Sequence, residues 1–385
     1  MRSKSETSKA LSSKFNTNTH HKMVQKQIDF LNAMEQGATS RDSFLKYIQS
    51  GVDLSDLGRK KLSIIGSVSE YDSKTFIESL RRHFDIVENE GEVLLLWAEE
   101  EKIPYYVLRD DREFPLFFTA ANKTDEIPDT LGEYLKEDQM MSRMWVGKQE
   151  MERYRQQMVQ AHEHLIIPYF TAKRSKHSEI PAKERPSYDR TISYWADDGL
   201  ETFRHMKSRY GVLPTNIQFE DPGSFKFVVT QKGVFTSMEG GVGQIADLLQ
   251  QTVKRLREIK LKIDTGGYEQ EQYQDVLSNL SMPCSKPWAI QLDGRPEIQD
   301  IKYLENNVAE SNLEFRVLNF DVDYEQRSFD AEFMDTEDYG RTAVRTKKEE
   351  IRIFPQEATG IDQNIRIYNF IDDHIEPGCS AIEVA

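Results

Sequence analysis

The sequence predicts a mixed α+β fold, and two patterns indicate it. The apolar residues recur with a helical period up to about Leu80 and then alternate from Phe84 onward. The last third of the chain consists of short β-type runs separated by polar turns. We therefore expect a helical N-terminal segment with a small antiparallel sheet, a long connecting helix, and a second α+β region with a strand-rich C-terminus. With 385 residues, the chain has room for two or three domains.

Residues 1–22 and 23–121 make up the predicted N-terminal part. Residues 1–22 are polar, so we expect a flexible tail. Residues 23–121 are predicted to form the first domain. In it, a helix that starts near Asp72 precedes a hairpin over 84–87 and 93–97, and strands over 105–108 and 114–119 follow. This is the element order of a winged helix.

Residues 131–168 are predicted to form the long connecting helix, because methionines, leucines and Trp145 recur at helical spacing and Pro168 follows. Residues 169–190 are polar, basic and rich in proline, which predicts a mobile loop. Residues 191–385 are assigned to the second α+β domain. It is expected to contain helices over 195–210, 245–259 and 269–280, a hairpin at 225–235, and strands over 315–320, 329–333, 351–354 and 365–371.

Composition restricts the class of protein. The formal net charge is −15, which favours solubility and repels phosphate backbones over most of the surface. Two scattered cysteines, Cys284 and Cys379, are typical of a reduced, intracellular protein, so we expect a cytoplasmic location. The sequence has no apolar stretch near the length of about 20 residues that a membrane helix needs, and no membrane partner is predicted.

A nucleic-acid contact is the first candidate site. Residues 1–61 contain eleven Lys and Arg against six Asp and Glu, a local excess of positive charge in an acidic chain. Lys74, Arg81 and Arg82 lie on the helix that precedes the hairpin, where a winged helix contacts DNA. The alternative is a helix that packs on a sheet, with a basic tail that aids solubility.

An anion-binding turn is the second candidate. Gly240, Gly241 and Gly243 lie between a predicted strand and a predicted helix, where backbone N–H groups can hold an anion. A nucleotide-hydrolysing loop would need a Lys and a Ser or Thr, but Gln244 and Ile245 stand there. The alternative is that the glycines serve the turn itself.

An acidic strand is the third candidate. Asp321 and Asp323 alternate along a predicted strand and so lie on one face, where carboxylates could hold Mg²⁺ or Mn²⁺. The alternative is a solvated strand face in an acidic protein.

The resulting functional hypothesis is a non-enzymatic binding protein, either a nucleic-acid-associated regulator or an assembly component that contacts other proteins. It requires no cofactor. The alternative hypothesis is a metal-dependent enzyme that acts on nucleotides or nucleic acid through Asp321 and Asp323, with Mg²⁺ or Mn²⁺ as its cofactor.

Overall fold

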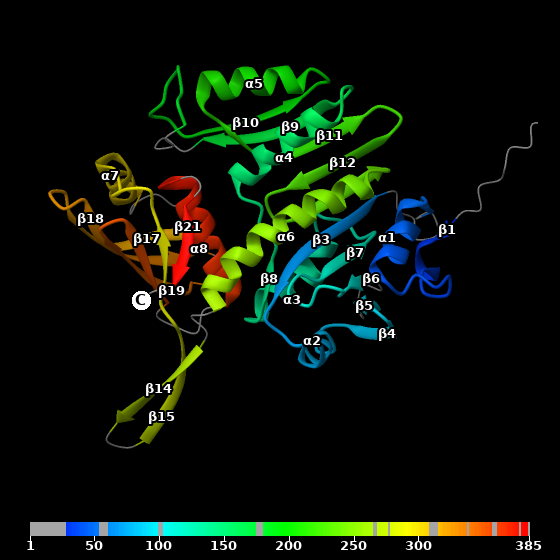
Figure 1. Cartoon of the computed structure of the whole chain (residues 1–385), viewed down its shortest axis with the longest axis horizontal. Helices are drawn as coiled ribbons and strands as arrows, with labels where there is room; N and C mark the ends of the chain where they lie inside the picture. The colour runs from blue at the N-terminus through cyan, green and yellow to red at the C-terminus, as the bar shows by residue number, and fades with distance from the viewer. Residues whose placement is uncertain are drawn as a thin grey trace, which may run out of the picture.

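The protein is a mixed α+β molecule built on two antiparallel sheets (Figure 1). The structure, a computed structural model, describes residues 28–53, 61–98, 103–174, 180–264, 268–275, 278–307, 315–336, 339–355, 360–376 and 379–383. Within these ranges the chain forms eight α-helices. No helix in the described ranges is long and apolar enough to cross a membrane.

The larger sheet has eleven strands, and every pairing in it is antiparallel. One of these strands, β8 (Met141–Arg143), pairs with β3 but does not belong to the consecutive order of the other ten. The other ten strands are, in spatial order, β10 (Arg190–Trp195), β9 (Ile166–Arg174), β11 (Leu213–Asp221), β12 (Phe225–Thr230), β13 (Val234–Glu239), β3 (Leu62–Ser69), β7 (Leu116–Thr119), β6 (Ile103–Leu108), β5 (Val93–Ala98) and β4 (Asp85–Glu90).

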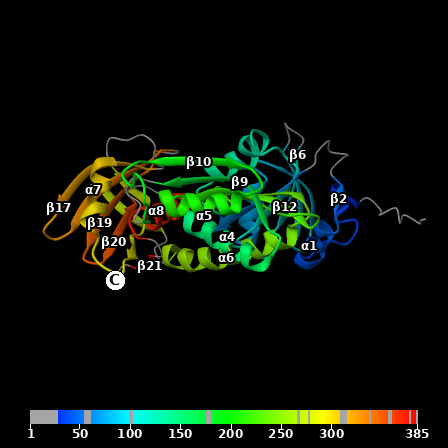
Figure 2. The ribbon, with the colours of Figure 1, turned by 90° about the horizontal axis from the view of Figure 1, so that it is seen from above.

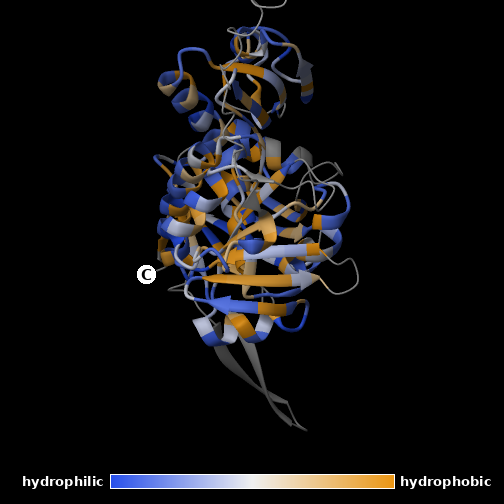
Figure 3. Cartoon of the chain, turned by 90° about the vertical axis from the view of Figure 1, so that its right-hand side faces the viewer, coloured by the Kyte–Doolittle hydropathy of each residue, from blue (hydrophilic) through white to orange (hydrophobic). Residues whose placement is uncertain are grey.

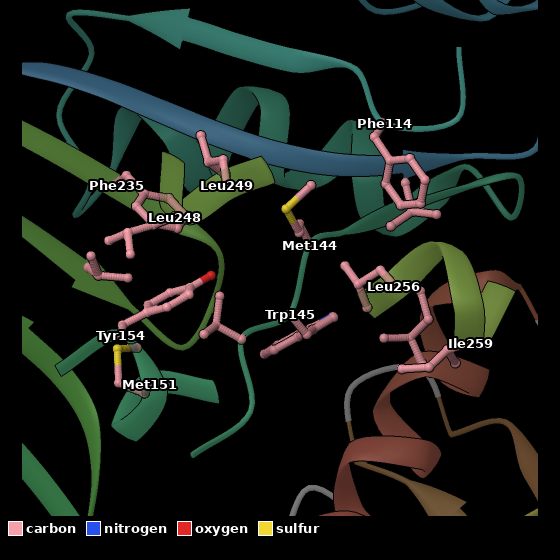
Figure 4. Packing of buried hydrophobic residues seen from close by; sticks show 14 of the residues in the cluster. Phe114, Met144, Trp145, Met151, Tyr154, Phe235, Leu248, Leu249, Leu256 and Ile259 are labelled. Carbon is pink, nitrogen blue, oxygen red and sulfur yellow. The ribbon is translucent and has the colours of Figure 1, made fainter. Parts of the chain in front are cut away.

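Helices cover the two faces of this sheet unequally. The helices on one face contribute to the larger hydrophobic core, with Phe44, Tyr154, Phe203 and Leu248 among their buried residues; Figure 4 shows part of this packing. They are α1 (Arg41–Gln49), α4 (Lys148–Ala161), α5 (Gly199–Tyr210) and α6 (Val242–Asp264). On the other face, α2 (Ser73–Leu80) and α3 (Glu133–Glu137) form a smaller core with β3 to β7. The hydrophobic residues follow the strands, and the outer surfaces of the helices are hydrophilic (Figure 3).

The C-terminal part of the chain forms the second sheet. Helices α7 (Ile298–Asn307) and α8 (Ile361–His374) contribute buried residues to the larger hydrophobic core, and a separate hairpin, β14 (Tyr268–Asp275) and β15 (Ser278–Ser285), extends from the body (Figure 1). The six strands are, in spatial order, β17 (Phe315–Asp323), β18 (Ser328–Asp335), β19 (Arg341–Lys347), β20 (Glu350–Pro355), β16 (Trp288–Gln291) and β21 (Ser380–Glu383).

Helix α6 joins the two sheets. It contacts α1 at one end of the molecule and α8 and β21 at the other, so it runs along the long axis (Figures 1 and 2). Helix α8 is held by polar contacts as well: the Trp145 indole N–H donates to Asp362 at 2.9 Å, and the buried Arg366 pairs with Asp362 and with Asp335. The two sheets therefore share one continuous core.

The predicted order of elements over residues 72–119 is confirmed. Asp72 caps α2 by accepting from the N–H groups of Lys74 and Thr75, and strands β4 to β7 follow in a consecutive antiparallel arrangement. The winged-helix interpretation is not supported, because these strands continue into the eleven-stranded sheet and α2 lies against that sheet. Trp97, expected to be largely buried, is only partly so.

The continuous helix predicted over residues 131–168 is wrong. Helix α3 ends at Asp138, whose backbone is extended and whose carboxylate accepts the Met140 N–H at 2.9 Å. The chain then pairs with β3 as strand β8, and α4 begins after Gly147. Pairing with a neighbouring strand here outweighs the local helical period, which is a weak determinant by itself.

Three further predictions are wrong, and all concern short segments. Residues 169–174 belong to β9 instead of a loop. Strands β14 and β15 lie where a helix is predicted over 269–280, and helix α8 includes the residues 365–371 predicted as a strand. The two predicted domains, 23–121 and 191–385, also share one sheet, because strands β9 to β13 continue the large sheet from β3. The predicted tail, 1–22, lies outside the described residues.

Candidate functional site

Strand β10 lies at one edge of the large sheet, and its side chains alternate between the two faces. Ile192 and Tyr194 turn toward the core beneath α5. The other face carries six residues in three cross-strand pairs, and we call it the open face: Trp195 opposite Tyr169, Ser193 opposite Thr171, and Thr191 opposite Lys173.

An exposed aromatic pair lies at one end of the open face. Trp195 is 72% exposed, whereas Trp145 and Trp288 are buried. The Trp195 ring packs on the Tyr169 ring with centroids 4.0 Å apart and an interplanar angle of 33°. A single exposed aromatic residue needs no explanation. Here a strand partner holds the indole in place and leaves much of it in solvent, which is an arrangement suited to stacking on a planar ligand.

Hydroxyl groups continue from the aromatic pair along the open face. The Tyr169 hydroxyl hydrogen-bonds with the Thr171 hydroxyl at 2.8 Å, and Thr171 in turn reaches the Ser193 hydroxyl at 3.3 Å. Thr191 and Lys173 follow, both exposed. Hydroxyl groups donate and accept, so this row can bind a sugar or a phosphate.

The open face has positive charge beside it. Lys173 is exposed and forms no ion pair with a described residue. Residues 171–190, from the end of β9 to the start of β10, contain six Lys and Arg against three Asp and Glu, and the connection proper, 175–189, contains three of each kind. Arg190 lies over the Tyr210 ring, with its guanidinium carbon 3.8 Å from the ring centroid. The local excess of cations contrasts with the net charge of −15 of the whole chain.

Lys74, Arg81 and Arg82 do not form a site together with the open face. All three are exposed on or after α2, which packs on the other half of the sheet. The Lys74 Nζ atom lies 3.8 Å from the Glu78 Oε1 atom on the same helix. These positions agree with a helix that packs on a sheet, which was the alternative interpretation of this motif.

Gly240, Gly241 and Gly243 lie at the β13–α6 junction, as expected, and two of them are required by the backbone. Gly240 and Gly241 have φ angles of +53° and +75°, a region that side chains disfavour. A Cβ atom on Gly241 would lie 2.9 Å from the Phe227 ring. The Ser237 hydroxyl donates to the Gly240 carbonyl at 2.5 Å. The backbone conformation of the turn therefore accounts for Gly240 and Gly241, and no bound anion is needed to explain them.

Asp321 and Asp323 are exposed at the end of β17, an edge strand of the second sheet. Asp323 accepts hydrogen bonds from the backbone N–H groups of Glu325 and Gln326, so it stabilises the turn into β18. Across the described part of the chain, no three His, Cys, Asp or Glu residues are grouped closely enough to hold a metal ion. This geometry gives the metal-dependent enzyme hypothesis no direct support.

A groove of about 740 Å³ runs along α6, between α1 and the β6–β7 connection. Phe114 and Leu249 are among its apolar lining residues. Its charged residues are largely paired with one another: Arg41 with Asp110 at 2.7 Å, and Arg257 with Asp111. These internal pairs involve four of its six charged lining residues, and the open face has the exposed aromatic ring in addition, so it is the stronger candidate.

The open face does not follow from the sequence-based predictions, which place Trp195 in a helix and residues 169–190 in a loop. A usable signal was present in the run from Thr191 to Tyr194, where polar and apolar side chains alternate with the period of a strand. Tyr169, Thr171 and Lys173 repeat the same period in β9.

Comparisons with known proteins match the same region. Residues 149–232 match a family model described as AF_0896_M, family middle domain. This range includes α4, β9, β10 and α5, and therefore the whole open face. A protein of Archaeoglobus fulgidus described as an uncharacterized protein is 24% identical over 331 residues, covering 82% of this chain and 89% of its own length.

Proposed function

We propose that the protein is a non-enzymatic, nucleic-acid-associated protein that binds single strands on the open face of β9 and β10. The observation that carries this proposal is the exposed Trp195 ring, packed at a tilt on Tyr169 and aligned with a row of hydroxyl groups and Lys173. Bases of a single strand have free planar faces, and stacking on an aromatic side chain contributes about 1–3 kcal/mol per base.

Electrostatics limits where such a ligand can bind. A chain with a net charge of −15 repels phosphates over most of its surface. The β9–β10 connection, 175–189, has equal numbers of basic and acidic residues, and Lys173 lies at the end of the open face opposite the aromatic pair. A strand whose base stacks on Trp195 can therefore direct its backbone past the hydroxyl row toward Lys173.

The experiment is a fluorescence-anisotropy titration of the full chain with labelled oligothymidylate, oligouridylate and a duplex, at low and at moderate salt. The single strands should bind more tightly than the duplex, and binding should weaken as salt rises. Trp195→Ala should weaken single-strand binding about five- to 150-fold, from the loss of one stacked base. Lys173→Gln should reduce the salt dependence by about one phosphate contact.

Tyr339→Ala is the matched control, because Tyr339 is also an exposed aromatic residue, at 69%, but precedes β19 of the second sheet. It should bind as the wild type does. No single-strand binding at micromolar protein, or equal losses in the Trp195 and Tyr339 variants, would refute the proposal.

A further inference from the structure

The hydroxyl row of the open face consists of Tyr169, Thr171 and Ser193, on two strands that lie side by side at one edge of the large sheet (Figure 1). Two hydrogen bonds link the row internally, one of 2.8 Å between the Tyr169 and Thr171 hydroxyls and one of 3.3 Å between the Thr171 and Ser193 hydroxyls. No other group in the described part of the chain hydrogen-bonds with these three hydroxyls. Their remaining hydrogen-bonding capacity is therefore available to solvent or to a ligand.

That remaining capacity consists mainly of acceptor positions. A hydroxyl has one hydrogen to donate but can accept more than one hydrogen bond. Whichever atom donates in each bond, the two internal bonds use two of the three hydrogens in the row. The row can therefore donate one further hydrogen bond and can accept several.

This imbalance distinguishes between the polar groups of a nucleic-acid strand. Phosphate oxygens only accept, so they match the single hydrogen that the row has left and none of its acceptor positions. A ribose 2′-hydroxyl both donates and accepts, so it can use those acceptor positions, and a deoxyribose has no hydroxyl there. The row is therefore better matched to a ribose than to a phosphate or a deoxyribose.

The order of groups along the open face also matches the order within one nucleotide. On β9, Tyr169, Thr171 and Lys173 follow one another at intervals of two residues, about 6.6 Å each. Trp195 and Ser193 lie opposite the first two. When a base stacks on the aromatic pair, its sugar comes next to the hydroxyls, and a phosphate follows toward the lysine.

We infer that the strand bound on the open face is RNA, and that the hydroxyl row recognises it by accepting a hydrogen bond from a ribose 2′-hydroxyl. This inference rests on the proposed function and adds the chemical class of the strand. One such hydrogen bond corresponds to about a two- to tenfold gain in affinity over the matching DNA strand.

The test is a fluorescence-anisotropy titration of the full chain with labelled oligouridylate and oligodeoxyuridylate of equal length, which carry the same base and differ only in the 2′-hydroxyl. The ribo-oligomer should bind about two- to tenfold more tightly. An oligomer of 2′-fluoro-2′-deoxyuridylate should bind no more tightly than oligodeoxyuridylate, because fluorine has no hydrogen to donate. Thr171→Val should lower the ratio of the ribo- and deoxy-affinities to about one. If that variant loses the wild-type circular dichroism, Ser193→Ala supplies the same comparison.

Thr124→Val is the matched control, because Thr124 is an exposed threonine in the connection after β7, outside the open face. It should keep the wild-type ratio. Equal affinities of the wild type for the two oligouridylates would overturn the inference, and so would a ratio that Thr171→Val leaves unchanged. If Trp195→Ala still weakens the binding of both oligomers, those results leave the single-strand proposal intact. A wild type that binds neither oligomer would overturn both.

Discussion

Arg366 and Asp335 form an ion pair almost without solvent, with side-chain exposures of 2% and 0%. Removing one partner of such a pair leaves a buried charge without compensation, which costs about 3–5 kcal/mol. Arg366→Ala should therefore lower the free energy of unfolding by that amount in urea denaturation. Arg345→Ala is the control. The side chains of Arg345 and Asp330 are about 60% exposed, with Nε and Oδ2 3.7 Å apart, and such an exposed pair contributes about 0–1 kcal/mol to the free energy of unfolding. Equal losses in the two variants would contradict the buried position of α8.

Glu152 provides a prediction about pH. It accepts hydrogen bonds from Arg155 and Lys207 at 2.7 Å. Burial raises the pKa of this carboxyl, but the hydrogen bonds and charges of Arg155 and Lys207 outweigh burial, so its pKa lies below the usual 4.5. A carboxyl with a lowered pKa stabilises the fold above its unfolded-state pKa, and that contribution is lost as pH falls through the folded-state value.

Glu152→Gln should accordingly be less stable than the wild type at neutral pH, by about 2 kcal/mol. The difference should shrink as the pH falls below about 4.5, since the wild-type carboxyl then takes up a proton as well. Urea denaturation of both proteins at neutral pH and below about pH 4.5 measures this difference in the free energy of unfolding. Glu78→Gln, at an exposed pair with Lys74, should show no comparable change. A Glu152→Gln difference that is independent of pH would contradict the assignment.

Single residues also explain which elements could be predicted. Asp72 and Ser40 cap α2 and α1 through their own side chains, so the local sequence determines where these helices begin. Trp195 shows the opposite case. The alternation in β10 is a local signal for a strand, but its pairing with Tyr169 on β9 joins residues far apart in the sequence and has no local pattern.

At the scale of elements, the wrong predictions share a cause. The helical spacing of Met141, Met144 and Trp145 predicts a helix, yet the backbone of β8 pairs with β3. The isoleucines of residues 365–371 predict a strand, yet these residues lie in helix α8. Its residues are buried between two sheets, and a helix buried on several sides loses the amphipathic period that identifies it.

The β17–β18 hairpin provides the test of the alternative, enzymatic hypothesis. Asp321 and Asp323 are exposed, and an Asn at position 323 can still accept the two backbone N–H groups that close the turn. Asp321→Asn with Asp323→Asn should change the free energy of unfolding by no more than about 0.5 kcal/mol. Neither protein should gain in melting temperature from Mg²⁺ or Mn²⁺. A metal-dependent gain in the wild type that the double variant loses would restore the enzyme hypothesis.

The whole molecule depends on contacts between distant parts of the chain. The eleven-stranded sheet places β13 beside β3, and α6 then carries the core into the second sheet. The sequence indicated the mixed α+β class and the strand-rich C-terminus, because composition and periodicity are local properties. It did not indicate that one sheet would join residues from both predicted domains, since strand order depends on those distant contacts.

The measurement that tests the proposed binding site most directly is the intrinsic fluorescence of Trp195 during titration with an unlabelled oligothymidylate. Trp195 is 72% exposed, so acrylamide should quench it readily, and a base stacked on its ring should both quench its emission and protect it from acrylamide. Trp195→Phe identifies the part of the signal that comes from this residue. We predict a saturable loss of emission that disappears in Trp195→Phe. An oligonucleotide that binds the protein and leaves the Trp195 emission and its acrylamide quenching unchanged would contradict the assignment of the open face.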